Sequence, residues 1–214
     1  MKLWFACVPL MEARPELIQV YLAKKELLES LVGFTMFQGV LAVAKIPVLA
    51  DLATVLAAAA KPRLLVAVDK IGNAENLGTV VRNCVAFGTQ GLIVGETSSS
   101  PFLRRAVRNS MGAIFDLPVV QSRNLVATLA ELRRLGIRCV AAHPAPGGRT
   151  LAQTDFSGDS CVIFGSEGHG ISPEILAACD EAVAIPMPPH VDSLNVAAAA
   201  AVFLYEVCRQ RGRG

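Results

Sequence analysis

The sequence predicts an α/β fold in which a mainly parallel sheet carries helices on both faces. From residue 64 onward, short apolar runs alternate with segments of helical spacing, as in a series of βαβ units. Two helical segments end on Gly88 and Gly136, a common way for a helix to stop. With 53% hydrophobic and 18% charged residues among 214, the chain can bury a large core in one domain of ordinary size.

Five of the apolar runs have the length of buried strands, and helices are expected around them. The expected strands span 64–68, 91–95, 137–142, 160–165 and 182–186, and the expected helices span 76–88, 101–112, 123–136 and 172–180. A last helix contains the alanine run 197–201. Asn76 and Ser172 are candidate N-caps of two helices, and Asp192 or Ser193 is the candidate cap of the last.

Residues 1–60 are too short for a separate domain and are predicted to be an N-terminal extension of a main domain at 61–214. An amphipathic helix is expected at 15–32, a strand-like stretch around Gln38–Gly39 and a helix at 52–60. The apolar start lacks the cleavage pattern of a signal peptide. No apolar run reaches the ~20 residues that span a bilayer. A cytoplasmic protein without a membrane segment is therefore predicted.

The cysteines and histidines indicate no metal site. Six cysteines lack C-x-x-C spacing and lie mostly in apolar segments, so reduced thiols in the core are predicted. The three histidines are scattered along the chain, unlike a set of metal ligands. The net charge of +2 is too small to identify a partner, so local clusters of arginine must carry that argument.

One such cluster is formed by Arg104, Arg105 and Arg108, which lie on a single expected helix. Arg104 and Arg108 are four residues apart and share a helix face. The cluster is either a solvated face or a surface that binds phosphates, and the second reading predicts a steep salt dependence of binding.

Three polar loops follow strands at the edge where parallel sheets bind ligands. The first, at 69–76, leads to Gly78 and to Arg82, which stands in an otherwise apolar helical pattern. That arginine is either functional or snorkels from a half-buried face. The second loop, at 165–170, places Glu167 among three glycines. It is either a place where a ligand meets the backbone or a tight turn with a solvated glutamate.

The third loop, at 186–193, contains the prolines and leads to Ser193 and Asn195 on the first turn of the alanine-rich helix. Backbone N–H groups are free there, so these polar side chains either cap the helix or bind a ligand. A dinucleotide site is disfavoured, because the glycines of 165–170 follow a late strand and do not read G-x-G-x-x-G after the first one.

Together these segments resemble the three motifs of the SpoU (TrmH-like) RNA 2′-O-ribose methyltransferases of the SPOUT class. The first motif is similar to Asn76-Leu77-Gly78 followed by Arg82, the second to FGSEGHGIS at 164–172, and the third to IPMPPHVDSLNVAAAAAVFLYE at 185–206. The resemblance covers residues 62–210 and includes the family's basic helix at 98–113. Glu75 stands where many relatives carry a histidine, and residues 1–60 resemble only the end of an RNA-binding domain.

The resemblance implies a C-terminal trefoil knot, a homodimer, and methylation of a ribose 2′-hydroxyl in structured RNA (tRNA or rRNA) with S-adenosyl-L-methionine as cofactor. The implied catalytic residues are Asn76, Arg82, Glu167, Ser193 and Asn195; the implied cofactor-binding residues are Gly165, Ile185, Met187 and Leu194; the implied RNA-binding residues are Arg104, Arg105 and Arg108. Arg82 is expected to clamp a phosphate, and Glu167 to orient Arg82 or share the proton.

Two other functions remain open on the sequence. One is a catalytically silent RNA-binding protein of the same fold, although the joint presence of Arg82, Glu167 and Asn195 favours an enzyme. The other is a dinucleotide-dependent oxidoreductase. A preference for S-adenosylmethionine or for NADH would distinguish a methyltransferase from an oxidoreductase.

Overall fold

The structure is a computed structural model that describes residues 2–36, 39–144, 148–188, 190–191 and 193–212. The chain divides into two compact units, Met1–Ile46 and Pro47–Gly214. The helix expected at 52–60 is present as α3 (Leu52–Ala58) and belongs to the second unit, where Val55 and Leu56 are buried. The assignment of residues 1–60 as part of an RNA-binding domain stays a prediction.

The described residues of the first unit form two helices, α1 (Lys2–Glu12) and α2 (Lys25–Val32). The predicted helix over 15–32 is therefore wrong for its first part, where residues such as Val20 and Tyr21 favour extended backbone. Helix α1 was not predicted.

The predicted strand around Gln38–Gly39 falls partly on Gln38, which lies outside the described residues. From Gly39 to Ala50 the chain forms no strand, so the prediction is wrong there. Among the described residues of this unit, Met36 is the one buried hydrophobic side chain, at 5% exposure. Packing therefore does little to fix its elements.

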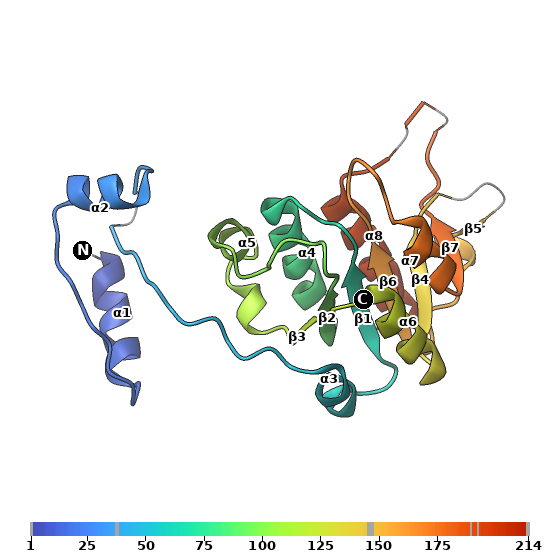
Figure 1. Cartoon of the computed structure of the whole chain (residues 1–214), viewed down its shortest axis with the longest axis horizontal. Helices are drawn as coiled ribbons and strands as arrows, with labels where there is room; N and C mark the ends of the chain where they lie inside the picture. The colour runs from blue at the N-terminus through green and yellow to red at the C-terminus, as the bar shows by residue number, and fades with distance from the viewer. Residues whose placement is uncertain (1, 37–38, 145–147, 189, 192, 213–214) are drawn as a thin grey trace. The chain divides into compact units, whose positions relative to one another are not determined.

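The second unit is built on a seven-stranded sheet in which all neighbouring strands are parallel (Figure 1). The strands are β1 (Leu64–Val68), β2 (Gly91–Val94), β3 (Val119–Gln121), β4 (Arg138–Ala142), β5 (Arg149–Thr150), β6 (Ser160–Phe164) and β7 (Glu181–Ala184), in the order β3-β2-β1-β6-β4-β7-β5. The five predicted strands are confirmed. Strands β3 and β5 were missed because three and two residues are too few to show a periodic pattern.

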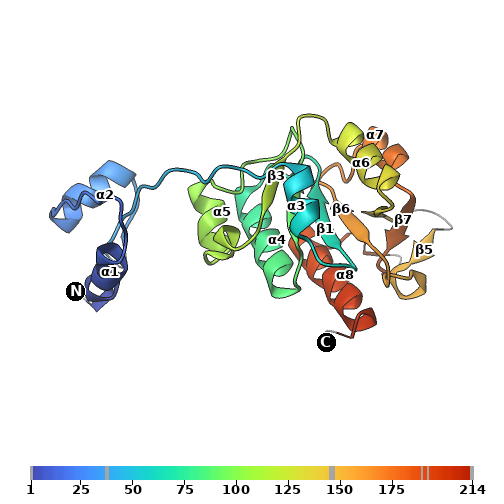
Figure 2. The same ribbon diagram turned by 90° about the horizontal axis from the view of Figure 1, so that it is seen from below.

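Helices cover both faces of the sheet, as predicted (Figure 2). One face carries α4 (Ala74–Ala86), α5 (Arg104–Asn109) and α8 (Val196–Gln210), and the other carries α3, α6 (Leu125–Arg134) and α7 (Pro173–Ala178). Short 3₁₀ turns lie at η1 (Ala113–Phe115) and η2 (Leu151–Gln153). Alternating side chains of each strand build two cores, so that Val66 and Val68 lie under α4 and α8 while Leu65 and Ala67 face α3 and α6.

The predicted cap of α4 is wrong, whereas that of α7 is confirmed in position. Asn73, rather than Asn76, caps α4, because its side-chain oxygen accepts the backbone N–H groups of Glu75 and Asn76 at 2.8 and 3.2 Å. The side chain of Asn76 is thereby available for another contact. Ser172 does stand at the N-cap position of α7, but its hydroxyl makes no capping bond.

The six cysteines are free, and Cys84, Cys139, Cys161 and Cys208 are buried. Burial raises the pKa of the Cys84 and Cys139 thiols to about 12. These thiols therefore stay protonated near neutral pH and serve as small core side chains, which agrees with the expected location. None of the helices formed by the described residues is long and apolar enough to cross a membrane.

The C-terminal end of α8 is fastened at the amino edge of the sheet by Arg211. Its guanidinium donates to the carbonyl oxygens of Phe156, Pro62 and Arg63 at 2.9, 3.0 and 3.1 Å. These carbonyls come from the segments that precede β6 and β1. One side chain thus joins three parts of the chain that are remote in sequence.

Candidate active site

The carboxyl ends of β1, β6 and β7 bring the three polar loops to one edge of the sheet. Strands β1 and β6 are neighbours, with Val68 beside Phe164, and β7 lies one strand further on, beyond β4. The backbone N–H of Asp69 extends the pairing by donating to the Phe164 carbonyl at 2.9 Å. The loops therefore meet where parallel topology predicts a ligand site.

Side chains from all three loops meet at Asn195. Its Nδ2 donates to Glu167 Oε1 at 2.6 Å and to Asn76 Oδ1 at 3.2 Å. Glu167 follows β6, Asn76 lies on the first turn of α4, and Asn195 precedes α8. The fold thus brings together three of the sequence-predicted catalytic residues. Glu167 and Asn76 lie 28 and 119 positions from Asn195 along the chain.

The cap of α8 sets the orientation of the Asn195 amide. Asn195 Oδ1 accepts the backbone N–H groups of Ala197 and Ala198 at 2.9 and 3.4 Å. Its NH₂ group is therefore left to donate to Glu167. The predicted cap by Ser193 is wrong, and the alternative, Asp192, lies outside the described residues. An asparagine suits this position because one end of its amide accepts while the other donates.

The loop that carries Glu167 is closed at its base. Ser166 and Gly170 exchange backbone hydrogen bonds of 3.0 and 2.8 Å. A Cβ on Gly165 would overlap the Gly170 backbone, so only glycine allows the two ends of the loop to approach this closely. Glu167 is consequently presented, exposed, on a short and well-defined loop.

A buried carboxylate fastens the far end of this loop. Asp69 is 4% exposed and accepts both the backbone N–H and the hydroxyl of Ser172, each at 2.8 Å. Charge-assisted hydrogen bonds of this kind are roughly twice as strong as neutral ones. Sequence reasoning missed Asp69, because an aspartate directly after a strand is an ordinary turn residue.

Arg82 lies on a different side of α4 from Asn76. Six residues separate the two, which places them about 120° apart around the helix axis. Gly78, one turn before Arg82, packs against the Ala106 backbone of α5. Arg82 is exposed, and the described residues give it no salt bridge. The Glu167 carboxylate accepts from Asn195, and among the described residues no salt bridge joins Glu167 to Arg82.

The three predicted RNA-binding arginines lie exposed on α5. Because α5 packs against α4 at Gly78, its arginines extend the surface on which Arg82 lies. Arg82, Arg104, Arg105 and Arg108 therefore share the flank of the sheet formed by α4 and α5. This geometry suits phosphate binding better than proton removal.

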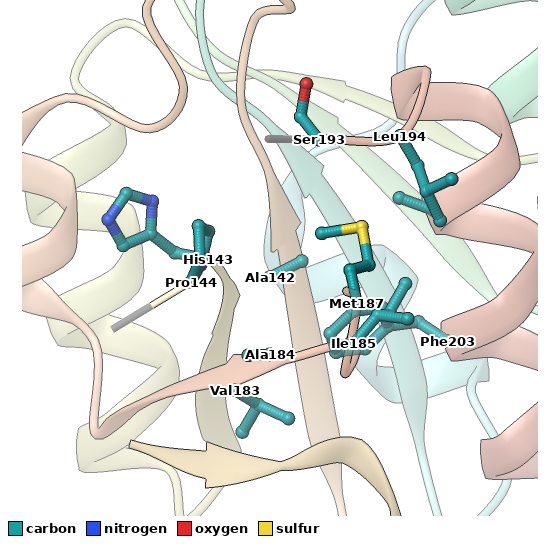
Figure 3. Close-up of a pocket in the computed structure, with 11 residues that line it drawn as sticks. Ala142, His143, Pro144, Val183, Ala184, Ile185, Met187, Ser193, Leu194 and Phe203 are labelled. Carbon is teal, nitrogen blue, oxygen red and sulfur yellow. The ribbon is translucent and has the colours of Figure 1, made fainter. Parts of the chain in front are cut away.

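A pocket opens where β4 and β7 end and α8 begins (Figure 3). Its lining residues are Ala142, His143, Pro144, Val183, Ala184, Ile185, Met187, Ser193, Leu194, Ala199 and Phe203. Ser193 and three of the four predicted cofactor residues, Ile185, Met187 and Leu194, are among them, whereas Gly165 is not. Figure 3 shows Ile185, Met187 and Leu194 on one side and His143 on the other.

His143 is a pocket residue that sequence reasoning missed. A Cβ built on Gly170 would lie 3.8 Å from His143 Nδ1, so the imidazole stands beside the loop that carries Glu167. It therefore links the pocket to that loop. The available signal was its position directly after β4, at the carboxyl edge of the sheet.

A parallel sheet with polar loops gathered beside a largely apolar pocket defines a ligand-binding α/β domain. The chain belongs to the SpoU rRNA methylase family, whose model matches residues 63–205. It is 41% identical over 155 residues to an uncharacterized tRNA/rRNA methyltransferase of Mycobacterium avium, covering 72% of this chain and 50% of that protein. The chain thus spans about half the length of the curated relatives it matches.

Solved structures support the same family. The SpoU methyltransferase AviRb from Streptomyces viridochromogenes, in complex with AdoMet, is similar with a TM-score of 0.68 and 32% identity, covering 77% of this chain and 66% of that one. A structure that concerns the 2-OH methylation of C/U34 on tRNA is similar with a TM-score of 0.62 and 29% identity, covering 70% of this chain and 97% of that one.

Proposed function

We propose that this chain is an RNA methyltransferase that transfers a methyl group from S-adenosylmethionine to a ribose 2′-hydroxyl of tRNA or rRNA. One observation carries the proposal: Asn195 joins Glu167 and Asn76 at the edge of the pocket-bearing sheet. Each of these residues belongs to a different motif of the family. The 2′-hydroxyl specificity is supported by the related tRNA-modifying structure.

The pocket fits S-adenosylmethionine in chemical character. Val183, Ile185, Met187 and Leu194 offer apolar walls for an adenine ring, and the backbone around them offers polar groups for its edge. His143 and Ser193 add side-chain polarity. The cofactor supplies an electrophilic methyl group on a sulfonium. The protein's task is to bring a ribose hydroxyl in line with that methyl group.

The polar cluster has two tasks in this reaction. The 2′-hydroxyl must lose its proton as the new O–C bond forms, and in this proposal the exposed Glu167 carboxylate accepts it. Asn195 holds that carboxylate through the 2.6 Å bond. Positioning of this kind supplies several kcal/mol of a barrier. Ser193 and Asn76 line the same centre.

Arg82 acts as a clamp on a phosphate next to the target ribose. A guanidinium has a pKa above ~12 and is a poor base. Its donor geometry suits phosphate oxygens, and its charge favours developing negative charge on the hydroxyl oxygen. The α5 arginines continue this phosphate contact along the RNA.

We further propose a homodimer and a C-terminal trefoil knot. Helix α8 exposes an apolar stripe of Ala198, Val202 and Tyr205, with Val202 40% and Tyr205 55% exposed. Covering this stripe by a second copy would bury apolar area. The proline-containing loop after β7 would be the thread of the knot, and α8 its tail. A cytoplasmic location suits a protein that modifies tRNA or rRNA.

The test is calorimetric titration of the whole chain with S-adenosylmethionine and, separately, with NADH. Transfer of a labelled methyl group to tRNA and rRNA transcripts follows, and alkaline hydrolysis then identifies the atom, since a 2′-O-methyl ribose blocks cleavage at its own phosphodiester. Saturable binding of S-adenosylmethionine alone, with alkali-resistant product, is expected. If RNA binds without methyl transfer, the catalytically silent alternative replaces the proposal. Binding of NADH would favour an oxidoreductase.

A further inference from the structure

A second asparagine of α4 reaches the first turn of α8. Asn83 Nδ2 donates to the backbone carbonyl of Ala197 at 2.7 Å, across 114 positions of sequence. Asn83 is half-buried and was not singled out from the sequence, because an asparagine amid a helical pattern reads as a surface residue. Its partner lies two residues after Asn195, within the turn that carries the polar cluster.

Asn76 and Asn83 occupy one stripe of α4. Seven residues separate them, which is close to two helical turns, so both face the same side. That side faces α8, which lies next to α4 on the same face of the sheet (Figure 1, Figure 2). Asn76 reaches the side chain of Asn195, and Asn83 reaches the backbone just beyond it.

Both backbone polar groups of Ala197 are hydrogen-bonded to asparagine side chains. Its N–H donates to Asn195 Oδ1 at 2.9 Å, and its carbonyl accepts from Asn83. Ala197 and Ala200 are 5% and 0% exposed, and their small side chains allow α4 to come close. The Asn83 bond therefore joins this turn to α4, and the same turn carries the Asn195 amide.

We infer that Asn83 is a positioning residue that sets where the first turn of α8 lies along α4, and hence where the Asn195 amide meets Glu167. The inference deepens the proposed function and rests on it for its effect on rate. Asn83 acts through Ala197 and touches neither cofactor nor RNA. A helix carbonyl has its own intrahelical donor four residues on, so loss of the Asn83 bond leaves Ala197 paired.

Two substitutions at Asn83 remove the hydrogen-bond donor while they keep a side chain of similar volume. Asn83→Leu keeps a side chain of similar size without a donor, and Asn83→Asp keeps the shape but opposes a carboxylate to the Ala197 carbonyl. Both are expected to lower kcat between about 10- and 100-fold, since misplacement near 1 Å can cost that much. The Kd for S-adenosylmethionine and the KM for RNA should change less than about twofold, because Asn83 contacts neither ligand.

The matched control is Gln90→Leu. The Gln90 amide also donates to a backbone carbonyl, Ala60 O at 2.8 Å, and it accepts the Leu64 N–H at 2.9 Å. These contacts lie at the amino end of β1, at the opposite edge of the sheet from the polar cluster. This variant should lower Tm at least as much as Asn83→Leu and leave kcat unchanged. Equal kcat values in the two variants would overturn the inference.

A structural readout separates failure of this inference from failure of the proposed function. In ¹⁵N-asparagine-labelled protein, the Asn195 side-chain amide is assigned by its loss in Asn195→Asp. Asn83→Leu should shift and broaden that resonance, whereas Gln90→Leu should leave it in place. An unchanged Asn195 resonance in Asn83→Leu would overturn the inference whether or not the wild-type chain methylates RNA. Absence of methyl transfer by the wild type would instead refute the proposed function alone.

Discussion

The Asn195 amide nitrogen lies 2.6 Å from Glu167 Oε1. This bond joins the turn that opens α8 to the glycine loop that follows β6, and it exists because the opposite end of the same amide is engaged by the helix N–H groups. A serine or threonine cap would have to accept and donate through a single oxygen atom, whereas asparagine uses two separate atoms. The bond therefore couples a helix-capping feature to the placement of a carboxylate.

Glu167→Gln tests what the charge of that carboxylate contributes. Glutamine keeps an acceptor for Asn195 but cannot take up a proton at neutral pH. We expect kcat to fall by about 10²-fold or more, within the range typical of general base catalysis, with the Kd for S-adenosylmethionine nearly unchanged. Single-turnover methyl transfer and calorimetry measure the two quantities. Glu174→Gln, at an exposed glutamate of α7, is the control, and equal rates for both variants would remove Glu167 from catalysis.

Arg82→Ala should abolish most turnover while leaving cofactor affinity intact. The reason is the position of Arg82 on the exposed α4–α5 flank, away from the pocket lining. Rates at saturating RNA and calorimetric Kd values check the prediction. Arg134→Ala removes an exposed arginine of α6, on the other face of the sheet, and should behave as wild type. A large loss of cofactor affinity in Arg82→Ala would contradict the clamp role.

Replacing Arg104, Arg105 and Arg108 together by alanine should weaken RNA binding and flatten its salt dependence. Each phosphate contact contributes about 0.7 to 0.9 to the slope of log K against log[salt], so three contacts account for a change of about 2 to 3. Filter binding between low and moderate salt measures the slope. An unaltered slope would show that these arginines form a solvated face.

Gly165→Ala should open the Glu167 loop, since the new methyl group overlaps the Gly170 backbone. We expect a loss of about 1 to 3 kcal/mol in the free energy of unfolding, as for other overpacked sites, together with weaker binding of S-adenosylmethionine. Urea unfolding and calorimetry provide both values. Gly158→Ala meets nothing within 4 Å and should be close to neutral. Equal stability of the two variants would mean that the loop can relax without cost.

Stability should depend on Glu206 in acid. Hydrogen bonds from Arg209 and then Gln210 lower the pKa of the Glu206 carboxyl from 4.5 to about 2. A lowered folded-state pKa contributes stability that is present above pH 4.5 and is lost as the pH falls toward 2. Glu206→Gln should therefore reduce Tm at pH 7 and show a smaller further fall between pH 4.5 and pH 2. A Tm profile parallel to that of the wild type would disprove this linkage.

The sheet and its helices follow from local patterns, and most of them are predictable from the sequence. Strand β1 is a plain apolar run, and α4 and α6 show clear helical spacing. The meeting of Asn76, Glu167 and Asn195 was expected only through resemblance to a family, since no local pattern encodes a contact across 119 positions. The roles of Asp69 and His143 were not predicted, because they depend on which strands become neighbours.

The caps show a finer limit. Asn73 and Asn76 both stand near the start of α4, and asparagine is a favourable N-cap residue. The backbone of Asn73 is extended, with φ −80° and ψ 110°, so the helix begins after it. Because α4 is capped by Asn73 and not by Asn76, three residues further on, the side chain of Asn76 can accept from Asn195 at the start of α8. Sequence rules resolve helix ends no more finely than this.

The clamp formed by Arg211 bears on how the protein is made. Its carbonyl partners, at residues 62–63 and 156, are translated before the guanidinium that binds them. The core beneath α8 likewise needs Phe203, Leu204 and Val207. The face of the sheet that α8 covers therefore stays open to solvent until α8 has been synthesised. Apolar surface that is exposed in this way makes an incomplete chain prone to aggregation.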